Sequence, residues 1–314
     1  CFNDMYFFPD VTAHVAAQSN MRATVGLIVI DFPSSWASDQ NDYFDKGLKV
    51  HDQYHREHPL IKTAFAPHAP YSVSDEPMKR VHMLANELEL PVHMHVHETQ
   101  DEVNMSLENH KVRPIERLNN LGMLSPSLLA VHMTQLTDKE ITLIADSGVH
   151  VVHCPQSNLK LASGFCPVAR LLEKGINVAL GTDSAASNNN LNMLEEMQTA
   201  ALLAKGVAND ASALPATQAL KMATINGARA LGIADETGSL TVGKSADVTA
   251  IKMNNIGTEP VYNPISQIVY ASQSHDVSDV WIAGKQVLKD RRLTLMDKDN
   301  IIKKARDWQE KISS

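Results

Sequence analysis

The sequence predicts an α/β protein: a (β/α)8 barrel that lacks its first strand, with part of a small β-sandwich appended. Three observations lead to this prediction. Seven short apolar runs alternate with segments of helical spacing, this series is one unit short of eight, and the pattern changes near Gly238. Strands alternating with helices form a parallel sheet covered by helices, and eight such units close a barrel of the TIM type.

Each expected strand is a short apolar run, and apolar residues recur every three or four positions in the segment that follows it. The expected strands are Cys1–Phe7, Thr24–Ile30, Ile61–Ala66, Pro91–His97, Leu128–His132, Val149–Cys154 and Val178–Gly181. The expected helices are Val11–Ser19, Tyr43–Glu57, Pro77–Leu88, Glu102–Asn109, Ile115–Leu121, Asp138–Ser147 and Val168–Lys174. Thr137 before Asp138 is a typical N-cap and supports one of these helix starts.

The last third of the chain departs from this alternation. Further helices are expected at Leu194–Lys205, Ala216–Ala223 and Ala228–Leu231, followed by β segments at Gly238–Val248, Ile265–Tyr270 and Val277–Val287 and a closing helix at Lys298–Ile312. We therefore expect two domains. Residues 1–235 would form the barrel, strands two to eight, and residues 236–314 the C-terminal part of the β-sandwich with its closing helix.

Composition excludes several classes of protein. Hydrophobic residues make up 44% of the 314 residues and charged residues 20%, which is ordinary globular usage. The formal net charge of −8 argues against a nucleic-acid partner. No run of about 18 apolar residues is present, so no membrane span is expected. Three scattered cysteines are too few for a disulfide framework, which favours the cytoplasm.

The beginning of the chain has an unusual composition. Cys1–Met5 carries no initiator methionine, no basic region and no apolar leader, and it has the character of a strand interior. We therefore expect the missing first β/α unit to precede Cys1. On that expectation the 314-residue chain alone would bind metal weakly, show no appreciable deaminase activity and aggregate through its unpaired sheet edges.

Histidine is the residue type that indicates function, because it is the commonest metal ligand and an acid or base near neutral pH. The strand Pro91–His97 carries three of the 14 histidines, His93, His95 and His97, and Glu98 follows directly. Alternate residues of a strand share one face, so we expect these histidines to face the barrel interior. An inner layer of hydrogen-bonded histidines is the alternative, and we favour it for the deeper His93.

The other expected strands end in similar residues. His68, His132 and His153 follow or close three of them, and Asp183 follows a fourth. Catalytic residues of barrels lie at the C-terminal ends of the strands, so these side chains should converge on one mouth. Histidines and an aspartate suit a divalent metal that activates water. A neighbouring glutamate can then move protons to the substrate.

These motifs resemble those of a known superfamily. The segment His95–Glu98, the lone His132 and the triplet Gly181–Asp183 look like the H-x-x-E, His and TD motifs of the amidohydrolases. Three longer segments, Ala66–Tyr71, His153–Leu161 and Gly181–Asn189, resemble the 5-methylthioadenosine/S-adenosylhomocysteine deaminase group. That group is related to the s-triazine chlorohydrolases and to guanine and cytosine deaminases. The segment Gly238–Asp247 resembles the strand that returns these chains to their β-sandwich.

The resemblance implies a role for each matching residue. His95 and Asp183 would bind one divalent metal, with zinc expected and iron or manganese also suitable. Asp183 would also accept the proton of the attacking water, and His132 would hydrogen-bond that water. Glu98 would give a proton to the ring nitrogen of the substrate. His97 would be a neighbour of the site and not a ligand.

The resemblance also implies substrate contacts and exposes two departures from the family pattern. His68, Ser187 and Glu98 would contact the nucleoside. The H-x-H pair of the family's first strand, which supplies two metal ligands, has no counterpart in this chain. Arginines that hold an amino-acid tail in some relatives are also missing, because Val29–Lys46 contains none. If further ligands are needed, His68, His97 and His153 are the first candidates.

The expected function is therefore the hydrolytic deamination of an aminated purine nucleoside, of the adenosine, 5-methylthioadenosine or S-adenosylhomocysteine type, with release of ammonia. A guanine or cytosine deaminase and an s-triazine aminohydrolase or chlorohydrolase are alternatives. A barrel without catalysis that serves as an assembly protein is an alternative of another class, and the intact set of His95, Glu98, His132 and Asp183 argues against it. We expect a homo-oligomer for the complete protein.

Overall fold

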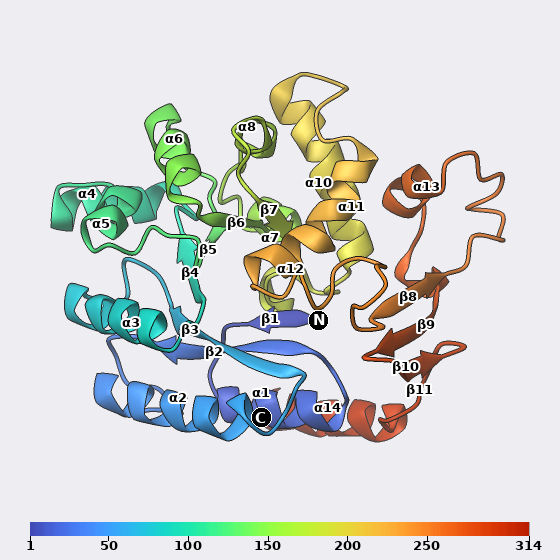
Figure 1. The fold of residues 1–314 in the computed structure, drawn as a ribbon, viewed down its shortest axis with the longest axis horizontal. Helices are drawn as coiled ribbons and strands as arrows, with labels where there is room; N and C mark the ends of the chain where they lie inside the picture. The colour runs from blue at the N-terminus through green and yellow to red at the C-terminus, as the bar shows by residue number, and fades with distance from the viewer. Residues whose placement is uncertain (314) are drawn as a thin grey trace.

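The computed structural model describes residues 1–313 and contains a curled parallel sheet of seven strands in chain order, β1 to β7 (Figure 1). The strands are β1 (Phe2–Asp4), β2 (Ala23–Val29), β3 (Ile61–Pro67), β4 (Val92–Val96), β5 (Leu128–His132), β6 (His150–His153) and β7 (Val178–Leu180). All seven residues of β2 are buried, as expected for a parallel strand covered on both faces. The predicted α/β barrel architecture is confirmed.

Helices follow the strands and lie around the outside of the curled sheet (Figure 1). They are α1 (Pro9–Gln18), α2 (Gln40–His55), α3 (Asp75–Glu87), α4 (Gln100–His110), α5 (Pro114–Asn120), α6 (Asp138–Ser147), α7 (Pro155–Lys160), α8 (Val168–Glu173), α9 (Ala185–Asn188), α10 (Met193–Ala208), α11 (Ala216–Met222) and α12 (Ile225–Ala230). The capping box of Thr137 and Glu140 begins α6. Two short helices, α7 and α9, were not expected from the sequence, and both lie beside the site described below.

A second sheet lies at one side of the molecule (Figure 1). Its four strands are antiparallel in the order β11 (Arg292–Leu293), β10 (Lys285–Lys289), β9 (Val277–Ile282) and β8 (Val248–Ile251). The hairpin of β9 and β10 turns at Gly284, as the sequence predicts. The division at residues 235 and 236 stays a prediction.

The prediction of a β segment at Ile265–Tyr270 is wrong, because Pro264–Tyr270 forms helix α13. Asn263 caps this helix by accepting hydrogen bonds from the backbone N–H groups of Ile265 and Ser266. Proline at the first helical position and asparagine before it are both helix-start signals. An apolar run of six residues fits a buried strand as well as a helix, so the cap decides between the two.

The prediction of a β segment at Gly238–Val248 is also wrong, except at its end, where β8 begins. Gly238 and Gly243 have φ angles of +87° and +96°, and the backbone bonds here are local turns, such as Lys244 N to Thr241 O. Asp247 anchors the loop to the barrel by accepting from Arg22 Nε at 2.6 Å. This ion pair joins the start of β2 to the second sheet.

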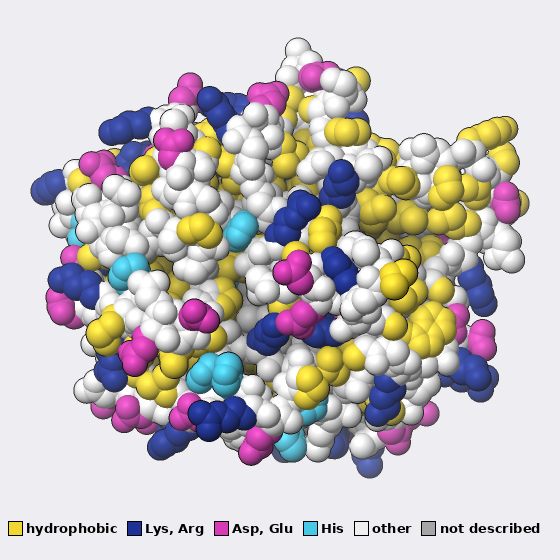
Figure 2. Space-filling model, in the orientation of Figure 1, with side chains coloured by type: hydrophobic (Ala, Val, Ile, Leu, Met, Phe, Trp, Pro, Cys, Tyr) yellow, Lys and Arg dark blue, Asp and Glu magenta, His cyan; other side chains and the backbone are white. Residues whose placement is uncertain are grey.

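The chain ends in α14 (Lys298–Ser313), an amphipathic helix with no buried residue in its described part. Among residues 1–313, no helix is both long enough and apolar enough to cross a bilayer. On the face drawn in Figure 2, lysine and arginine side chains are interspersed with aspartate and glutamate. This face shows no broad basic patch of the kind that nucleic-acid binding needs.

Candidate active site

Three residues at the C-terminal edge of the parallel sheet come together as a potential metal site. One ligand atom from each of His95, His132 and Asp183 lies within 4.8 Å of the others. The parallel register explains the meeting of the two histidines, because His132 of β5 pairs with Val96 of β4, next to His95. Asp183 lies in the loop after β7, the last strand of the sheet, three residues after that strand ends. The sequence predicted all three as site residues.

Hydrogen bonds to the far ring nitrogen orient both histidines. His95 Nδ1 lies 2.8 Å from the carbonyl oxygen of His68, and His132 Nδ1 lies 2.8 Å from Asn158 Oδ1. Each Nδ1 must donate its proton to such an oxygen, which leaves Nε2 unprotonated and able to bind a metal or a water. Burial lowers the pKa of both histidines, so both stay neutral near pH 7.

Asp183 is held by two serines from separate short helices. Ser157 of α7 and Ser187 of α9 each donate a hydroxyl hydrogen bond of 2.6 Å to the same carboxylate oxygen, Oδ2. Burial alone would raise the pKa of Asp183, but these hydrogen bonds outweigh it and hold the pKa below its ordinary value. Asp183 therefore stays ionised, as a metal ligand or a proton acceptor must.

Glu98 faces the same cluster from the loop after β4. Its Oε1 lies 3.8 Å from His132 Nε2. Its backbone is fixed on both sides: its N–H donates to Glu102 Oε2 at 2.7 Å, and its carbonyl oxygen accepts from Thr134 Oγ1 at 2.7 Å. Burial raises the pKa of Glu98. The site thus holds two carboxyl groups whose pKa values shift in opposite directions, which is the usual arrangement of an acid and a base.

Besides Glu98, the residues expected to contact substrate are His68 and Ser187, and both lie at the same edge of the sheet. His68 follows β3, and its ring packs edge-on against Tyr71, with ring centroids 5.8 Å apart. The Tyr71 side chain is half exposed, so this pair forms part of the rim. Ser187 is turned toward Asp183 by its hydrogen bond. His68 is also linked to the metal-type cluster, because its carbonyl oxygen orients His95.

The other histidines of the region have structural surroundings. His97 does not share the face of His95, because β4 ends at Val96 and His97 takes a left-handed φ of +53°. Its ring is buried between Gln135 O, 3.0 Å from Nδ1, and Ile115 N, which donates to Nε2 at 3.2 Å. Both ring nitrogens are occupied, so His97 is no ligand. His93 lies deeper on β4, beside the Asn3 amide at 3.0 Å.

Backbone strain marks the same edge of the sheet. His132, Met133 and Asp183 have φ angles of +77°, +51° and +60°, in the left-handed region that residues with a side chain seldom adopt. Such strain persists where the surrounding contacts over-determine it, and it is commonly found at functional sites. Here the left-handed backbone occurs at the last residue of β5, His132, and in the loop after β7, at Asp183, and the two side chains meet in the metal-type cluster.

Four residues that hold the site in place through hydrogen bonds are not indicated by the sequence. Ser157, Asn158, Glu102 and Thr134 carry no metal-type signature, and each acts only through a hydrogen bond to a site residue. A signal existed for one of them, since Thr99 and Glu102 are spaced as a helix N-terminus, which places a carboxylate beside the end of β4. The others become visible only when α7 and the loop after β5 fold against the strand ends.

Comparison with known proteins identifies the family. A model of the amidohydrolase family matches residues 1–287. The chain belongs to this family. It is 50% identical over 314 residues to a 5-methylthioadenosine/S-adenosylhomocysteine deaminase of Teredinibacter turnerae, a match that covers 100% of this chain and 71% of that protein.

Solved structures share the fold over nearly all of the chain. An adenosine deaminase from Xanthomonas campestris with bound zinc superposes with a TM-score of 0.97 and 52% identity, over 99% of this chain and 71% of that chain. A zinc complex of an atrazine chlorohydrolase from Arthrobacter aurescens superposes with a TM-score of 0.90 over 97% of this chain and 71% of its own. Its identity of 23% makes the second a likeness of fold alone.

The residues of the site fit the divalent metal that the family implies. Neutral imidazole nitrogens and an ionised carboxylate are the donor set of catalytic zinc sites. That set is supplied within one small volume by His95, His132 and Asp183. A hydrogen bond orients each of these side chains, through Nδ1 of each histidine and Oδ2 of the aspartate, as is usual for metal ligands.

Proposed function

We propose that this protein is a metal-dependent deaminase that hydrolyses the bond between the purine ring and the amino group of a nucleoside. The observation that carries the proposal is the cluster of His95, His132 and Asp183, whose ligand atoms lie within 4.8 Å of one another, with the carboxyl group of Glu98 3.8 Å from His132 Nε2. Burial raises the pKa of Glu98, and hydrogen bonds hold that of Asp183 below its ordinary value. Hydrolytic deamination needs both a proton donor to the ring and a proton acceptor for water.

In this reaction the oxygen of a water adds to the ring carbon, and the bond from that carbon to the amino group breaks. Asp183, which is ionised before the reaction, accepts one proton of the water and passes it to the departing amino group, which leaves as ammonia. Glu98 keeps its proton more readily than an exposed glutamate and gives it to the ring nitrogen beside the attacked carbon. Glu98 recovers a proton from the new hydroxyl group as the attacked carbon becomes a carbonyl. His132 presents an unprotonated Nε2, 3.8 Å from Glu98, and orients the attacking water.

His95 and Asp183 would hold the metal, with His132 Nε2 facing the same space. A divalent ion bound there would supply Lewis-acid activation, which makes water nucleophilic near neutral pH. Zinc suits the donor set best, and iron or manganese could replace it.

The substrate class follows from the surroundings of the site. His68 and Ser187 would contact the nucleoside. The segment from Val29 to Lys46 contains no arginine, so it offers no guanidinium to the carboxylate of an amino-acid tail. We therefore expect adenosine and 5-methylthioadenosine to react faster than S-adenosylhomocysteine.

Three further parts of the proposal concern the protein in its cell. Cys1, Cys154 and Cys166 are all free thiols in the structure, which suits the reducing cytoplasm. The net charge of −8 favours a small-molecule substrate over a nucleic acid. A homo-oligomer is proposed for the complete protein.

The test measures ammonia release by protein expressed from its complete gene and loaded with zinc. The panel holds adenosine, 5-methylthioadenosine, S-adenosylhomocysteine, guanine, cytosine and an s-triazine. We expect turnover of the nucleosides and a loss of about 10³-fold in Glu98→Gln. Glu108→Gln, an exposed change on the next helix, is the control. A metal-loaded, folded protein that releases no ammonia from any of the three nucleosides would overturn the proposal.

A further inference from the structure

Glu196 is a fully buried carboxylate that the proposed reaction does not use. It lies in the first turn of α10 and has 0% of its surface exposed. Burial raises the pKa of Glu196 to about 7, and hydrogen bonds from Gln156 and Asn188 counteract this rise. A buried carboxyl group is costly unless its oxygens accept hydrogen bonds. Both oxygens of Glu196 do so: Oε2 accepts from the backbone N–H of Gln156 at 3.3 Å, and Oε1 accepts from the side-chain amide of Asn188. The two donors belong to two different short helices.

The first hydrogen bond holds helix α7. Gln156 lies in the first turn of α7, and its side-chain amide also donates to Thr199 of α10 at 3.2 Å. The next two residues of α7, Ser157 and Asn158, hydrogen-bond Asp183 and His132. The position of α7 therefore decides how both site residues are held.

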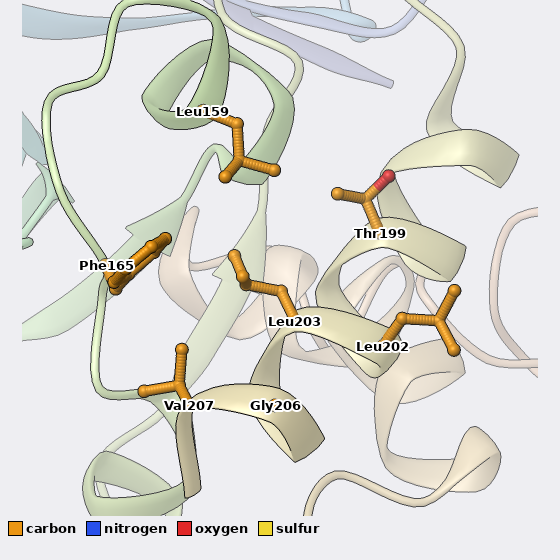
Figure 3. A pocket seen from close by; sticks show the side chains of 7 residues that line it. All are labelled: Leu159, Phe165, Thr199, Leu202, Leu203, Gly206 and Val207. Carbon is orange, nitrogen blue, oxygen red and sulfur yellow. The ribbon is translucent and has the colours of Figure 1, made fainter.

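Side-chain packing does little to fix the outer side of α7. A groove of about 710 Å³ opens there, with Leu159 of α7 on one side and Thr199 and Leu203 of α10 on the other (Figure 3). Leu159 is 44% exposed. Gln156 thus supplies two polar restraints between α10 and the N-terminal turn of α7.

The second hydrogen bond holds helix α9. Asn188 is the last residue of α9, and its side-chain amide donates both to Glu196 and, at 2.9 Å, to the carbonyl oxygen of Thr182. Thr182 directly precedes Asp183, and Ser187 directly precedes Asn188. Asn188 therefore connects Glu196 to both ends of the loop that presents Asp183.

We propose that Glu196 is a positioning residue for deamination, which sets α7 and α9 so that Ser157 and Ser187 reach the same oxygen of Asp183 and Asn158 reaches His132. Glu196 contacts none of the reacting groups and acts through these two helices. This inference rests on the proposed function for its catalytic consequence. Its structural part, the joint restraint of α7 and α9, stands independently.

The role of Glu196 can be tested with a substitution that changes hydrogen bonding and not size. Glu196→Gln keeps the size of the side chain but replaces one acceptor oxygen with an NH2 group, which only donates. That NH2 group must then point at the N–H of Gln156 or at the amide NH2 of Asn188, so one of the two hydrogen bonds is lost. Glu195→Gln is the matched control. Glu195 is the neighbouring residue, and it hydrogen-bonds only to the amides of Asn190 and Asn192, outside α7 and α9.

The first readout is amide hydrogen exchange, which needs neither metal nor substrate. We expect Glu196→Gln to speed exchange at least tenfold in residues 155–161 and 184–188, with strands β2 to β5 unchanged. The control should match the wild type. Equal exchange in Glu196→Gln and wild type would overturn the inference. If Glu196→Gln does not fold, Asn188→Ala replaces it. This variant removes the hydrogen bonds of Asn188 to Glu196 and to Thr182 and leaves that of Gln156, so it should loosen residues 184–188 and leave residues 155–161 as in the wild type.

The second readout separates positioning from general stability. We expect Glu196→Gln to bind zinc about 10- to 100-fold more weakly in competition with a chelator, and to lower kcat by a similar factor with KM within about threefold. In a protein that already carries Ser157→Ala and Ser187→Ala, Glu196→Gln should lower kcat by a smaller factor, because Glu196 acts on Asp183 through these two serines. Full additivity, or a lower Tm with unchanged kcat and zinc affinity, would overturn the inference. A wild type that is inactive on every nucleoside would instead refute the proposed function, and the exchange experiment would still decide the role of Glu196.

Discussion

The two sheets of this molecule differ in burial and in what their contacts serve. Strand β2 of the parallel sheet is buried along its whole length, whereas every residue of β10 in the antiparallel sheet is at least partly exposed. The strained, hydrogen-bonded residues lie at the C-terminal edge of the parallel sheet. The antiparallel sheet contributes no residue to this site. The site thus lies at the edge of the parallel sheet. The second sheet is attached through polar contacts near Arg22 and through apolar residues such as Ile251 and Val277, which pack against the core.

The largest effect is expected from changing the carboxylate that the parallel sheet presents. Asp183→Asn keeps shape and hydrogen-bonding size but removes the charge that accepts the proton of water and binds metal. We expect kcat to fall about 10³-fold or more, with the unfolding free energy somewhat below that of the wild type, because Ser157 and Ser187 favour the ionised carboxylate. Steady-state ammonia release and thermal unfolding check this. An active Asp183→Asn protein would show that the site lies elsewhere.

The attachment of the second sheet should matter for stability and not for chemistry. Arg22 is 5% exposed and its guanidinium donates twice to Asp247, at 2.6 and 3.3 Å. Arg22→Met leaves the partly buried carboxylate of Asp247 without its arginine partner and should cost about 3 kcal/mol of unfolding free energy, with kcat unchanged at low temperature.

Lys62→Met is the control for Arg22→Met. Lys62 pairs with Glu236, and both side chains are about two-fifths exposed, so this pair should contribute less than about 1 kcal/mol. Urea denaturation measures both variants. Equal losses in the two would contradict the role of the buried pair.

Acid should weaken the parallel sheet selectively. Burial lowers the pKa of His153 to about 3 and that of His68, which also lies beside His95, to about 4. An unfolded histidine takes up a proton below about pH 6.5 while the folded one stays neutral. The stability from each group is therefore complete above pH 6.5 and is lost as pH falls toward the folded value, at up to about 1.4 kcal/mol per pH unit.

Urea unfolding between pH 7 and pH 5 tests this, with His153→Gln as the informative variant. We expect His153→Gln to flatten the pH dependence by about one proton. His275→Gln is the matched change in the antiparallel part, where the ring is largely exposed, and it should leave the dependence as it is. A wild type whose stability does not change over this range would show that the buried histidines carry no such linkage.

The smallest effect is expected from the loop before the antiparallel sheet. Val242 is fully exposed, so Val242→Ser should change the unfolding free energy by less than about 0.5 kcal/mol. The same substitution at Val25, which is 0% exposed in β2, should cost more than about 2 kcal/mol. Chemical denaturation of the two variants gives the contrast, and similar losses would contradict it.

The same contrast in burial explains which elements the sequence predicts well. The parallel strands are apolar on both faces, so they stand out as continuous runs, and their helices have caps such as Thr137. In the antiparallel part burial is incomplete and short apolar runs are ambiguous. The apolar run Ile265–Tyr270 predicts a strand, but Asn263 and Pro264 begin a helix there. The segment Gly238–Val248 also predicts a strand, but its glycines lie in turns.

The candidate site divides in the same way. His95, Glu98, His132 and Asp183 could be predicted because chemically distinctive residues recur at the ends of parallel strands. Ser187 was named only through the family resemblance, as a substrate contact. The other supporting residues could not be predicted, because Glu196 and Ser157 are ordinary residue types at unremarkable spacings. Their roles depend on how α7 and α9 meet α10, which is a tertiary arrangement with no periodic signal.

The left-handed backbone at His132 and Asp183 has a consequence for anyone who engineers this protein. Glycine adopts such φ angles without penalty, and asparagine adopts them more easily than most residues. A library screened only for resistance to heat would therefore enrich these two residue types at positions 132 and 183, and each substitution would remove a group that the reaction needs. Thermostability and turnover would be selected in opposite directions at these two positions, so a useful screen must score ammonia release in the same round as survival.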